Sequence, residues 1–308
     1  MTALSQNILA EYPARKTKKQ KLAFIEMMRS HIPDLRVEEG GFLHNRNLIV
    51  GDIEQAEILL AAHYDTCAVL PFPNLIFPKN LPVSLLYALL ICIPFFLLMA
   101  VVEGLLIWLT DHFLFSYWTA FLVMMSALIG VCMLGRPNRH TVNDNTSGVI
   151  TLVELLSHPE LDGQKVAFVF FDNEENGLLG SAFFRKRHCK ELKQKLLINF
   201  DCVSDGDHFL FVSNRPARQK WERTLQEAMG QPEGKTLHFT RSSTTFYPSD
   251  QMGFPKSIAV AALKRSRLFG LYMDRIHTDR DTVLDEKNIT ALTDGMVHFI
   301  KLAAKSRK

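Results

Sequence analysis

Hydrophobic and polar positions along the chain change their spacing repeatedly, and the changes predict an alternation of strands and helices. Short apolar runs predict strands over Leu48–Asp52, Ala56–Ala62, Lys165–Asp172, Leu196–Asp201 and Ser257–Leu263. Amphipathic stretches predict helices over Leu4–Ile32, from Asn143 to about His158, and over Leu178–Arg187, Arg218–Met229 and Glu286–Ala304. Strands that alternate with helices in this way predict an α/β fold, in which helices flank a mostly parallel central sheet.

Two long stretches break this alternation. Residues 81–102 and 113–134 each run for 22 residues without a charged side chain. At ~1.5 Å per residue, a helix of this length spans about 33 Å, which is enough for a hydrocarbon core of roughly 30 Å. We therefore predict a two-helix transmembrane hairpin within a membrane insertion at residues 68–136, which divides the main domain into residues 1–67 and 137–308. A hydrophobic lid or a core hairpin of a soluble protein is the alternative.

Positive charges flank the predicted hairpin on one side only. Lys79 precedes the first stretch and Arg136 and Arg139 follow the second, whereas the connection around Asp111 carries no Lys or Arg. Loops rich in Lys and Arg stay in the cytoplasm. The pattern predicts a two-pass integral membrane protein of the cell membrane, with its main domain in the cytoplasm and the lipid bilayer as a partner. Glu103 is expected near an interface, because an acidic group at the bilayer centre is costly.

Charge and cysteine usage exclude several other classes. The formal charge of +3 is spread along the chain, so we expect no nucleic-acid partner. The basic cluster Arg15, Lys18, Lys19 and Lys21 is typical of a solvated helix face. Five cysteines without a CxxC spacing are interpreted as reduced thiols. The first thirty residues are too charged for a signal peptide, and no feature predicts an oligomeric state.

Polar side chains stand where two of the predicted elements meet loops. His63 and Asp65 are two residues apart at a strand end, so an extended chain places both on one face. A metal-bound imidazole often donates its second N–H to a carboxylate, which suits Asp65. Asp144 lies between Asn143 and Asn145 at the start of a helix. Taken alone, His63 and Asp65 are interpreted as ordinary polar residues of the surface or core, and Asp144 as a helix N-cap.

Further acidic residues and a histidine follow the later strands. Glu174 and Glu175 come directly after one apolar strand, Asp201 ends another, and His277 follows the last. The identical dipeptide Glu38–Glu39 follows no such strand and is interpreted as solvated charge. Open α/β sheets bind ligands at the carboxyl ends of their strands.

Taken together, these side chains form a set that suits a metal site. Two imidazoles and three carboxylates suit a pair of zinc ions with one bridging carboxylate, and one glutamate remains as a base.

Four short motifs resemble those of the M28 metallopeptidase family. They are Ala62–Thr66, Asn143–Gly148, Glu174–Leu178 and Ile276–Thr278, and the resemblance extends over about Leu48–Ala304 apart from the insertion. It implies the M28 zinc-peptidase fold, two Zn²⁺ ions as cofactors and a peptide as substrate.

The resemblance also implies a role for each site residue. His63 and Asp201 would hold one zinc ion, Glu175 and His277 the other, and Asp144 would bridge them. Glu174 would act as general base.

Three further residues are placed less directly. Tyr247, within Phe246–Asp250, is similar to a tyrosine that supports the oxyanion in the family. Asp250 and Asp281 are expected to support the site rather than to bind metal.

The predicted function is therefore that of a membrane-anchored di-zinc peptidase, an aminopeptidase by family frequency. A single-zinc transferase similar to glutaminyl cyclases and a non-catalytic M28-like binding or scaffold protein are the alternatives. His63 and Asp144 are 81 residues apart because the hairpin intervenes, and the apolar segment Ala68–Phe77 starts beside the site. This arrangement suggests that the mouth of the active site lies close to the bilayer.

Overall fold

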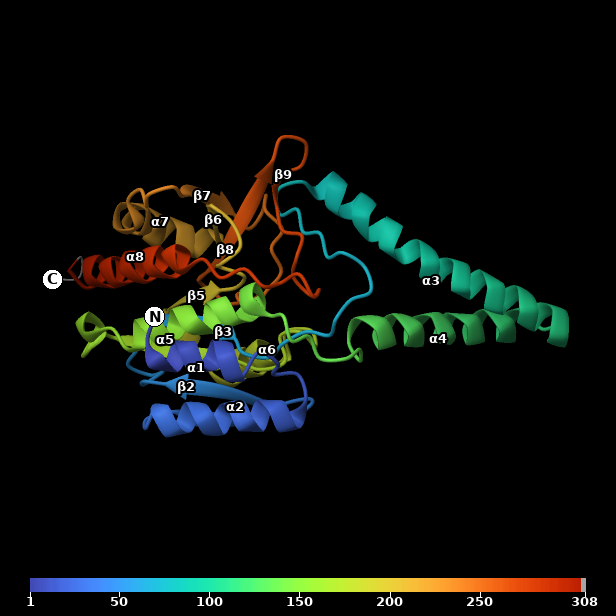
Figure 1. Ribbon diagram of the computed structural model, residues 1–308, viewed down its shortest axis with the longest axis horizontal. Coiled ribbons are helices and arrows are strands. Elements are labelled where there is room, and N and C mark those ends of the chain that lie inside the picture. Colours follow the sequence, from blue (N-terminus) through green and yellow to red (C-terminus); the bar gives the residue numbers. More distant parts are fainter. Residues whose placement is uncertain (306–308) are drawn as a thin grey trace.

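The computed structural model, which describes residues 1–305, has two parts of different shape (Figure 1). A layered body contains a central sheet and most of the helices. Two long helices, α3 (Leu81–Thr110) and α4 (Phe113–Cys132), project from one side of this body and meet at their far ends.

Within the described residues, nine strands form one sheet in the order β1-β2-β4-β3-β5-β8-β6-β7, with β9 paired to β8. The strands are β1 (Arg36–Gly40), β2 (Asn45–Val50), β3 (Ile58–His63), β4 (Val166–Phe171), β5 (Leu196–Phe200), β6 (His208–Ser213), β7 (Thr236–Arg241), β8 (Ser257–Ser266) and β9 (Gly270–Tyr272). The central strands β4, β3, β5 and β8 run parallel. Their continuous apolar sequences suit burial on both faces.

Helices cover both faces of this sheet, which confirms the predicted α/β fold with a central sheet flanked by helices. The main core packs α1, α2, α5, α7 and α8 on one face, while α6 packs Phe184 against Phe171 on the other. The bounds are α1 (Ala3–Glu11), α2 (Lys18–His31), α5 (Gly148–Leu156), α6 (Leu179–Arg187), α7 (Arg215–Met229) and α8 (Glu286–Lys305). Short helical turns span Val142–Ser147, Pro159–Leu161 and Glu191–Lys193.

The edges of the sheet differ from the predicted parallel arrangement. Strand β2 pairs antiparallel with β1 and β4, and β6 pairs antiparallel with β8. The strands β1, β6, β7 and β9 were not predicted. Strands β1 and β7 are mostly polar and β9 has three residues, whereas β6 is an apolar run that the prediction missed. Glu38 lies in β1 and binds Arg187 and His188, so it is not solvated as predicted, whereas Glu39 is exposed.

The single helix predicted over Leu4–Ile32 is wrong, because the chain turns between α1 and α2. Pro13 has no N–H to continue the first helix. Thr17 then caps the second helix, and Gln20 completes a capping box with it. The turn between the two helices carries Arg15 into the interior.

The helical hairpin is longer at one end than predicted. Helix α3 has 30 residues and continues to Thr110, eight residues past the predicted end, so Glu103 lies inside it. It ends where Asp111 adopts a left-handed conformation. By length and composition both helices could cross a membrane, and no residue in the most apolar stretch of α3 is buried.

The chain leaves the body and returns to it at one place. The N–H of Asn138 donates to the carbonyl of Cys67 at 3.1 Å, and that of Val69 donates to the carbonyl of Arg136 at 3.0 Å. A β-bridge between Ala68 and Pro137 lies between these bonds. Neighbouring entry and exit points are the geometry that an insertion into a loop requires.

Candidate metal centre

Three parallel strands bring predicted site residues to one edge of the sheet. His63 is the last residue of β3, Asp201 directly follows β5, and Glu174 and Glu175 follow β4 after a short turn. In the parallel register of β3 and β4, His63 lies opposite Phe171. Because parallel strands end at a common edge, the strand pattern alone brings these side chains together.

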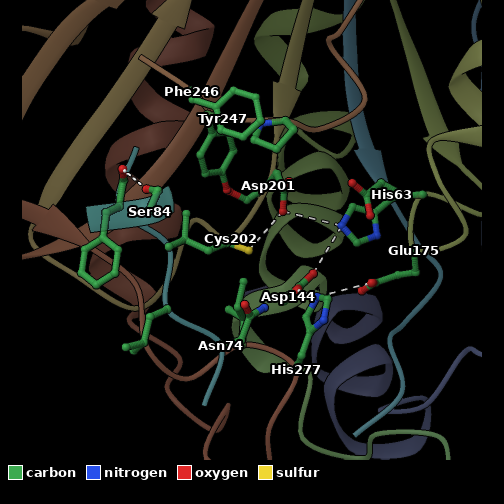
Figure 2. Close-up of a pocket in the computed structure, with 16 residues that line it drawn as sticks. His63, Asn74, Ser84, Asp144, Glu175, Asp201, Cys202, Phe246, Tyr247 and His277 are labelled. Atoms are coloured by element: carbon green, nitrogen blue, oxygen red, sulfur yellow. Dashed lines mark hydrogen bonds and ion pairs between the residues drawn. The ribbon is translucent and has the colours of Figure 1, made fainter. Parts of the chain in front are cut away.

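Asp144 lies between two histidines in this cluster (Figure 2). Its Oδ1 atom is 3.4 Å from Nε2 of His63, and its Oδ2 atom is 2.9 Å from Nε2 of His277. Asp201 Oδ1 lies 3.6 Å from the same nitrogen of His63, and Glu175 Oε2 lies 3.3 Å from that of His277. The five side chains form two groups of one imidazole and two carboxylates, and Asp144 belongs to both.

The loop before α5 fixes the position of Asp144. The N–H groups of Asn143 and Asp144 donate to the two carboxylate oxygens of Asp281 at 2.8 and 2.9 Å. Ser147, not Asp144, stands at the N-cap of α5. Asp144 is therefore held by other groups and turned into the cluster, while Asp281 supports the loop.

Two glycines allow α5 and α6 to start close to the backbone at the ends of β5 and β4. A Cβ atom on Gly148, the first residue of α5, would lie 2.5 Å from the carbonyl oxygen of Phe200 in β5. A Cβ atom on Gly180 in α6 would meet the backbone of Asp172. Only residues without a side chain let these two helices start so close to the sheet edge.

Asp65 acts through both its main chain and its side chain. Nδ1 of His63 lies 3.1 Å from the backbone carbonyl of Asp65 and 3.7 Å from its carboxylate. The two carboxylate oxygens accept the backbone N–H groups of Glu174 and Glu175 at 3.0 and 3.3 Å. The predicted orientation of the imidazole thus rests mainly on the carbonyl, and the carboxylate fixes the turn that carries both glutamates.

The acidic and basic groups in the cluster strongly shift one another's pKa values. Burial raises the pKa of Glu175 to about 8, and it raises the pKa of Glu174 well above its usual range. Burial alone would lower the pKa of His277, but Glu175 and Asp144 outweigh burial and raise it to about 9. Hydrogen bonds with both histidines outweigh burial at Asp144 and lower its pKa. The cluster is therefore short of positive charge.

The donor set fits divalent metal ions. Oε1 of Glu175 is buried and has no hydrogen-bond partner among the residues that the structure describes. Groups of imidazole and carboxylate ligand atoms within 4.8 Å of one another include His63 with Glu174 and Asp201, and His63 with Asp144 and Glu175. Nitrogen and carboxylate oxygen are ligands that zinc accepts.

The prediction of a solvated basic cluster is wrong for Lys21. The side chain is buried, and its Nζ atom lies 2.5 Å from Oδ1 of Asp172 and 2.7 Å from Oδ1 of Asn173. It is also 4.0 Å from Oδ2 of Asp65. Lys21 precedes Phe24 by three residues, which places it on the apolar face of α2, and this spacing could have revealed its burial.

The same prediction is wrong for Arg15. It is fully buried, and burial lowers its pKa to about 10. Its guanidinium donates to the carbonyl oxygens of Tyr12 and Tyr64 and, at 3.0 Å, to Oγ1 of Thr146. Tyr64 follows His63 and Thr146 lies in the loop of Asp144, so Arg15 joins two segments that the insertion separates. No local pattern in the sequence indicates this role. Lys18 and Lys19 are exposed, as predicted.

Two cysteines also lie beside the cluster, which the sequence did not indicate. Sγ of Cys202 is 3.1 Å from Oδ1 of Asp201, and Sγ of Cys67 lies within 4.8 Å of ligand atoms of Glu175 and His277. All five cysteines are free, in agreement with the predicted thiols.

The cluster opens into a cavity of about 270 Å³ with one apolar wall (Figure 2). Ile76, Phe77 and Ser84 line it from the segment that enters α3 and from the first turn of that helix. Tyr247 lines another side, and its hydroxyl donates to the carbonyl of Asp201 at 3.0 Å. Asp250 is buried nearby and lies outside the candidate ligand groups of the described residues.

Known proteins resemble this chain in sequence and in fold. The sequence model described as "Peptidase family M28" matches residues 129–300, more than half of the chain. This segment includes Asp144, Glu174 and His277 but not His63. No curated protein matches the chain.

Three solved structures illustrate the fold. The LapA aminopeptidase of Legionella pneumophila is 12% identical with a TM-score of 0.57, over 97% of this chain and 67% of that one. Porphyromonas gingivalis glutaminyl cyclase is 16% identical with a TM-score of 0.58, over 97% and 96%. Fimbriiglobus ruber glutaminyl cyclase is 14% identical with a TM-score of 0.56, over 97% and 94%. At such identities the likeness concerns the fold alone, whereas the sequence match extends over more than half of the chain. The chain therefore belongs to peptidase family M28.

Proposed function

We propose that this protein is a di-zinc peptidase, anchored in a membrane by α3 and α4, which removes N-terminal residues from peptides. One observation carries the proposal: the two carboxylate oxygens of Asp144 face two different histidines, at 3.4 and 2.9 Å. A carboxylate in this position can bridge two cations, and each histidine has a further carboxylate of its own. A zinc-dependent hydrolase is also the chemistry that membership of family M28 supports.

Each residue of the cluster has a role in this proposal. His63 and Asp201 hold one zinc ion, Glu175 and His277 hold the other, and Asp144 is shared. Bound zinc would supply Lewis acidity that polarises a peptide carbonyl and activates a water molecule.

Glu174 is proposed as the general base. It lines the cavity, and one of its oxygens lies within 4.8 Å of ligand atoms of His63 and Asp201. Its raised pKa suits a carboxylate that takes a proton from water and returns it to the leaving amine. Asp65 positions this carboxylate by holding its backbone N–H.

Tyr247 is proposed as the donor to the developing oxyanion. Its hydroxyl lies at the cavity, where it now donates to the carbonyl of Asp201. The proposed role requires this hydroxyl to turn from that carbonyl to the substrate oxygen.

The charges of the cavity favour the amino end of a peptide. Four carboxylates line it, whereas none of its described lining residues is Lys or Arg. A carboxypeptidase would need a Lys or Arg for the terminal carboxylate, whereas Glu174, the one lining carboxylate that is not assigned to zinc, can attract an ammonium group. The cavity volume of about 270 Å³ is at the low end for ligand sites, which suits a single terminal residue.

The membrane anchor is proposed from the hairpin and its flanking charges. Lys79, Arg136 and Arg139 flank the two apolar helices and favour a cytoplasmic body. Because the segment entering α3 also lines the cavity, the mouth of the site would lie near the bilayer surface.

Substitution of the proposed base tests the mechanism. We expect Glu174→Gln to lower kcat for an aminoacyl-anilide by about 10²–10⁴-fold, because the amide cannot accept the proton. Elemental analysis should still find about two zinc ions per chain, because the proposed metal ligands are unchanged. Glu39→Gln, at an exposed position of the other Glu-Glu pair, is the matched control and should retain activity. Unchanged activity of Glu174→Gln would refute the proposed base.

The glutaminyl cyclase alternative is tested in the same preparation. It is suggested by the fold shared with the Porphyromonas gingivalis enzyme over 96% of that chain. Cyclisation of peptides with N-terminal glutamine, together with about one zinc ion per chain, would favour this alternative.

A further inference from the structure

The turn between β8 and β9 exposes large hydrophobic side chains. Leu268 is 82% exposed, more than any other large hydrophobic residue that the structure describes, and Phe269 is 42% exposed. Turns at the tips of hairpins usually carry small or polar residues. An apolar tip of this kind indicates a contact surface.

This tip lies on the side of the body from which the helical hairpin leaves. Strand β8 pairs with β5 in parallel as far as Val260 and Phe200, and then continues to Ser266. The tip therefore projects past the sheet edge that carries the candidate metal centre. Figure 1 shows β9 beside the start of α3.

Two contacts join the tip to the base of α3. The ring of Phe269 lies 5.5 Å from the ring of Phe77, which precedes the helix. The side chain of Asn80, the N-cap of α3, donates to the carbonyl of Phe269 at 3.4 Å. If α3 enters the bilayer at this point, the tip lies at the level of the headgroups.

Basic side chains surround the two apolar ones. Arg265, Arg267 and Lys79 are exposed. Lys264, by contrast, is paired with Asp205 and Asp274. Exposed apolar residues between basic ones are typical of segments that lie in the interface of membranes with anionic lipids.

We propose that the β8–β9 tip, Arg265–Gly270 together with Lys79, is a second membrane contact that docks on an anionic lipid surface. This inference rests on the proposed membrane anchor and not on the peptidase activity. A protein partner or a second copy of the chain would have to share this position with the headgroups around α3, which favours lipid as the occupant.

The second contact would fix the cavity relative to the bilayer. Ile76, in the apolar wall of the cavity, exchanges backbone hydrogen bonds of 3.0 Å with Met273 just after β9. A tip held at the membrane surface would therefore hold this wall there as well.

Photocrosslinking of the full chain in lipid nanodiscs tests the proposal. A benzoylphenylalanine is introduced as Leu268→benzoylphenylalanine, and lipid adducts are counted by mass spectrometry. The same replacement at Leu22, exposed on α2, is the negative control, and that at Leu97, exposed on α3, is the positive control. In discs of phosphatidylglycerol we expect at least fivefold more lipid adduct at position 268 than at position 22. An equal yield at both positions, or adducts to protein in place of lipid, would overturn the proposal.

A charge reversal separates specific docking from mere proximity. R265E/R267E should lower the adduct yield at position 268 at least threefold in phosphatidylglycerol discs, with little change in phosphatidylcholine discs. Arg29→Glu, an exposed charge on α2, is the matched control and should have no effect. If R265E/R267E does not lower the adduct yield, docking on an anionic lipid surface is refuted.

Two measurements separate this inference from the earlier proposals. A lack of adduct at Leu97 would refute the membrane anchor and this inference with it. Aminoacyl-anilide hydrolysis, measured on the same discs, reports on the peptidase separately.

Discussion

Two buried basic residues, Arg15 and Lys21, stabilise the cluster from behind without facing the cavity. Lys21 binds Asp172, which follows β4 directly, and approaches Asp65. Arg15 binds the carbonyl beside His63. At the scale of single residues, the candidate centre thus depends on cations far from it in sequence.

Loss of the cation at Lys21 should destabilise the fold. We expect Lys21→Met to lower the free energy of unfolding by about 3–5 kcal/mol, because Asp172 would remain buried without its partner. The midpoint of thermal unfolding in detergent measures the effect. Lys18→Met, an exposed position one turn earlier in the same helix, should change little. If the decrease reflects the lost pair, Lys21→Met/Asp172→Asn should recover part of it, and a further decrease would argue against this cause.

At the scale of elements, most of the apolar strands were predictable and the edge strands β1 and β7 were not. Strands β3, β4 and β5 are buried along their whole length, or almost so, and their sequences are apolar. Strand β7 is only partly buried, and most of its residues are polar. Edge strands depend on pairing with a neighbour, which local patterns do not reveal.

The pairing of β6 with β7 should depend on pH. Nδ1 of His208 lies 3.0 Å from Nε2 of His238, and burial together with Arg265 lowers the pKa of both. A histidine with a lowered pKa in the folded state contributes stability that is complete above about pH 6.5 and is lost as the pH falls below it. In the zinc-loaded protein, the midpoint of thermal unfolding should therefore be lower at pH 5.5 than at pH 7.5.

Replacement of one histidine of the pair tests whether the pair causes the pH dependence. His238→Gln should show a smaller decrease between the two pH values than the unchanged protein. His31→Gln on α2 is the control and should follow the unchanged protein. An identical pH profile for His238→Gln would exclude the histidine pair as the origin.

At the scale of the whole molecule, the centre connects segments from the N-terminal turn to the loop before α8. His63 and Asp144 are separated by the hairpin, and Asp281 holds the loop of Asp144 from near the other end of the chain. A cation that binds these ligands would therefore stabilise the whole body and not only one loop.

Removal of metal should destabilise the protein most at high pH. Without a cation, Glu175 and Asp281 have raised pKa values of about 8 and about 7, so their ionisation costs stability as the pH rises from about 4 to 8. The raised pKa of His277, about 9, contributes stability below about pH 6.5 that is lost as the pH rises through 9. Both effects have the same sign in this window.

Zinc would reverse this dependence, because it binds ionised carboxylates and neutral imidazoles. We expect the difference in unfolding midpoint between zinc-loaded and chelator-treated protein to be larger at pH 8 than at pH 5.5. His277→Ala, which removes one proposed ligand, should reduce the difference. A difference that does not change with pH would contradict the assignment.

The sequence by itself determined the strand-end motifs, the family resemblance and the position of the apolar hairpin. These features depend on residues close together in the chain: a period of two or of 3.6, a charge-free run, a short motif. The carboxyl ends of parallel strands share an edge, so His63, Glu174, Glu175 and Asp201 could be expected near one another without coordinates.

Only the tertiary structure decided which charges are buried and what each carboxylate holds. Lys21 meets Asp172 across 151 residues, and Asp65 meets the backbone of Glu174 across 109. The burial of Arg15 and the apolar cavity wall supplied by the segment that enters α3 likewise result from distant packing. The free energy of a buried charge depends on its partners in space, and local sequence carries little information about them.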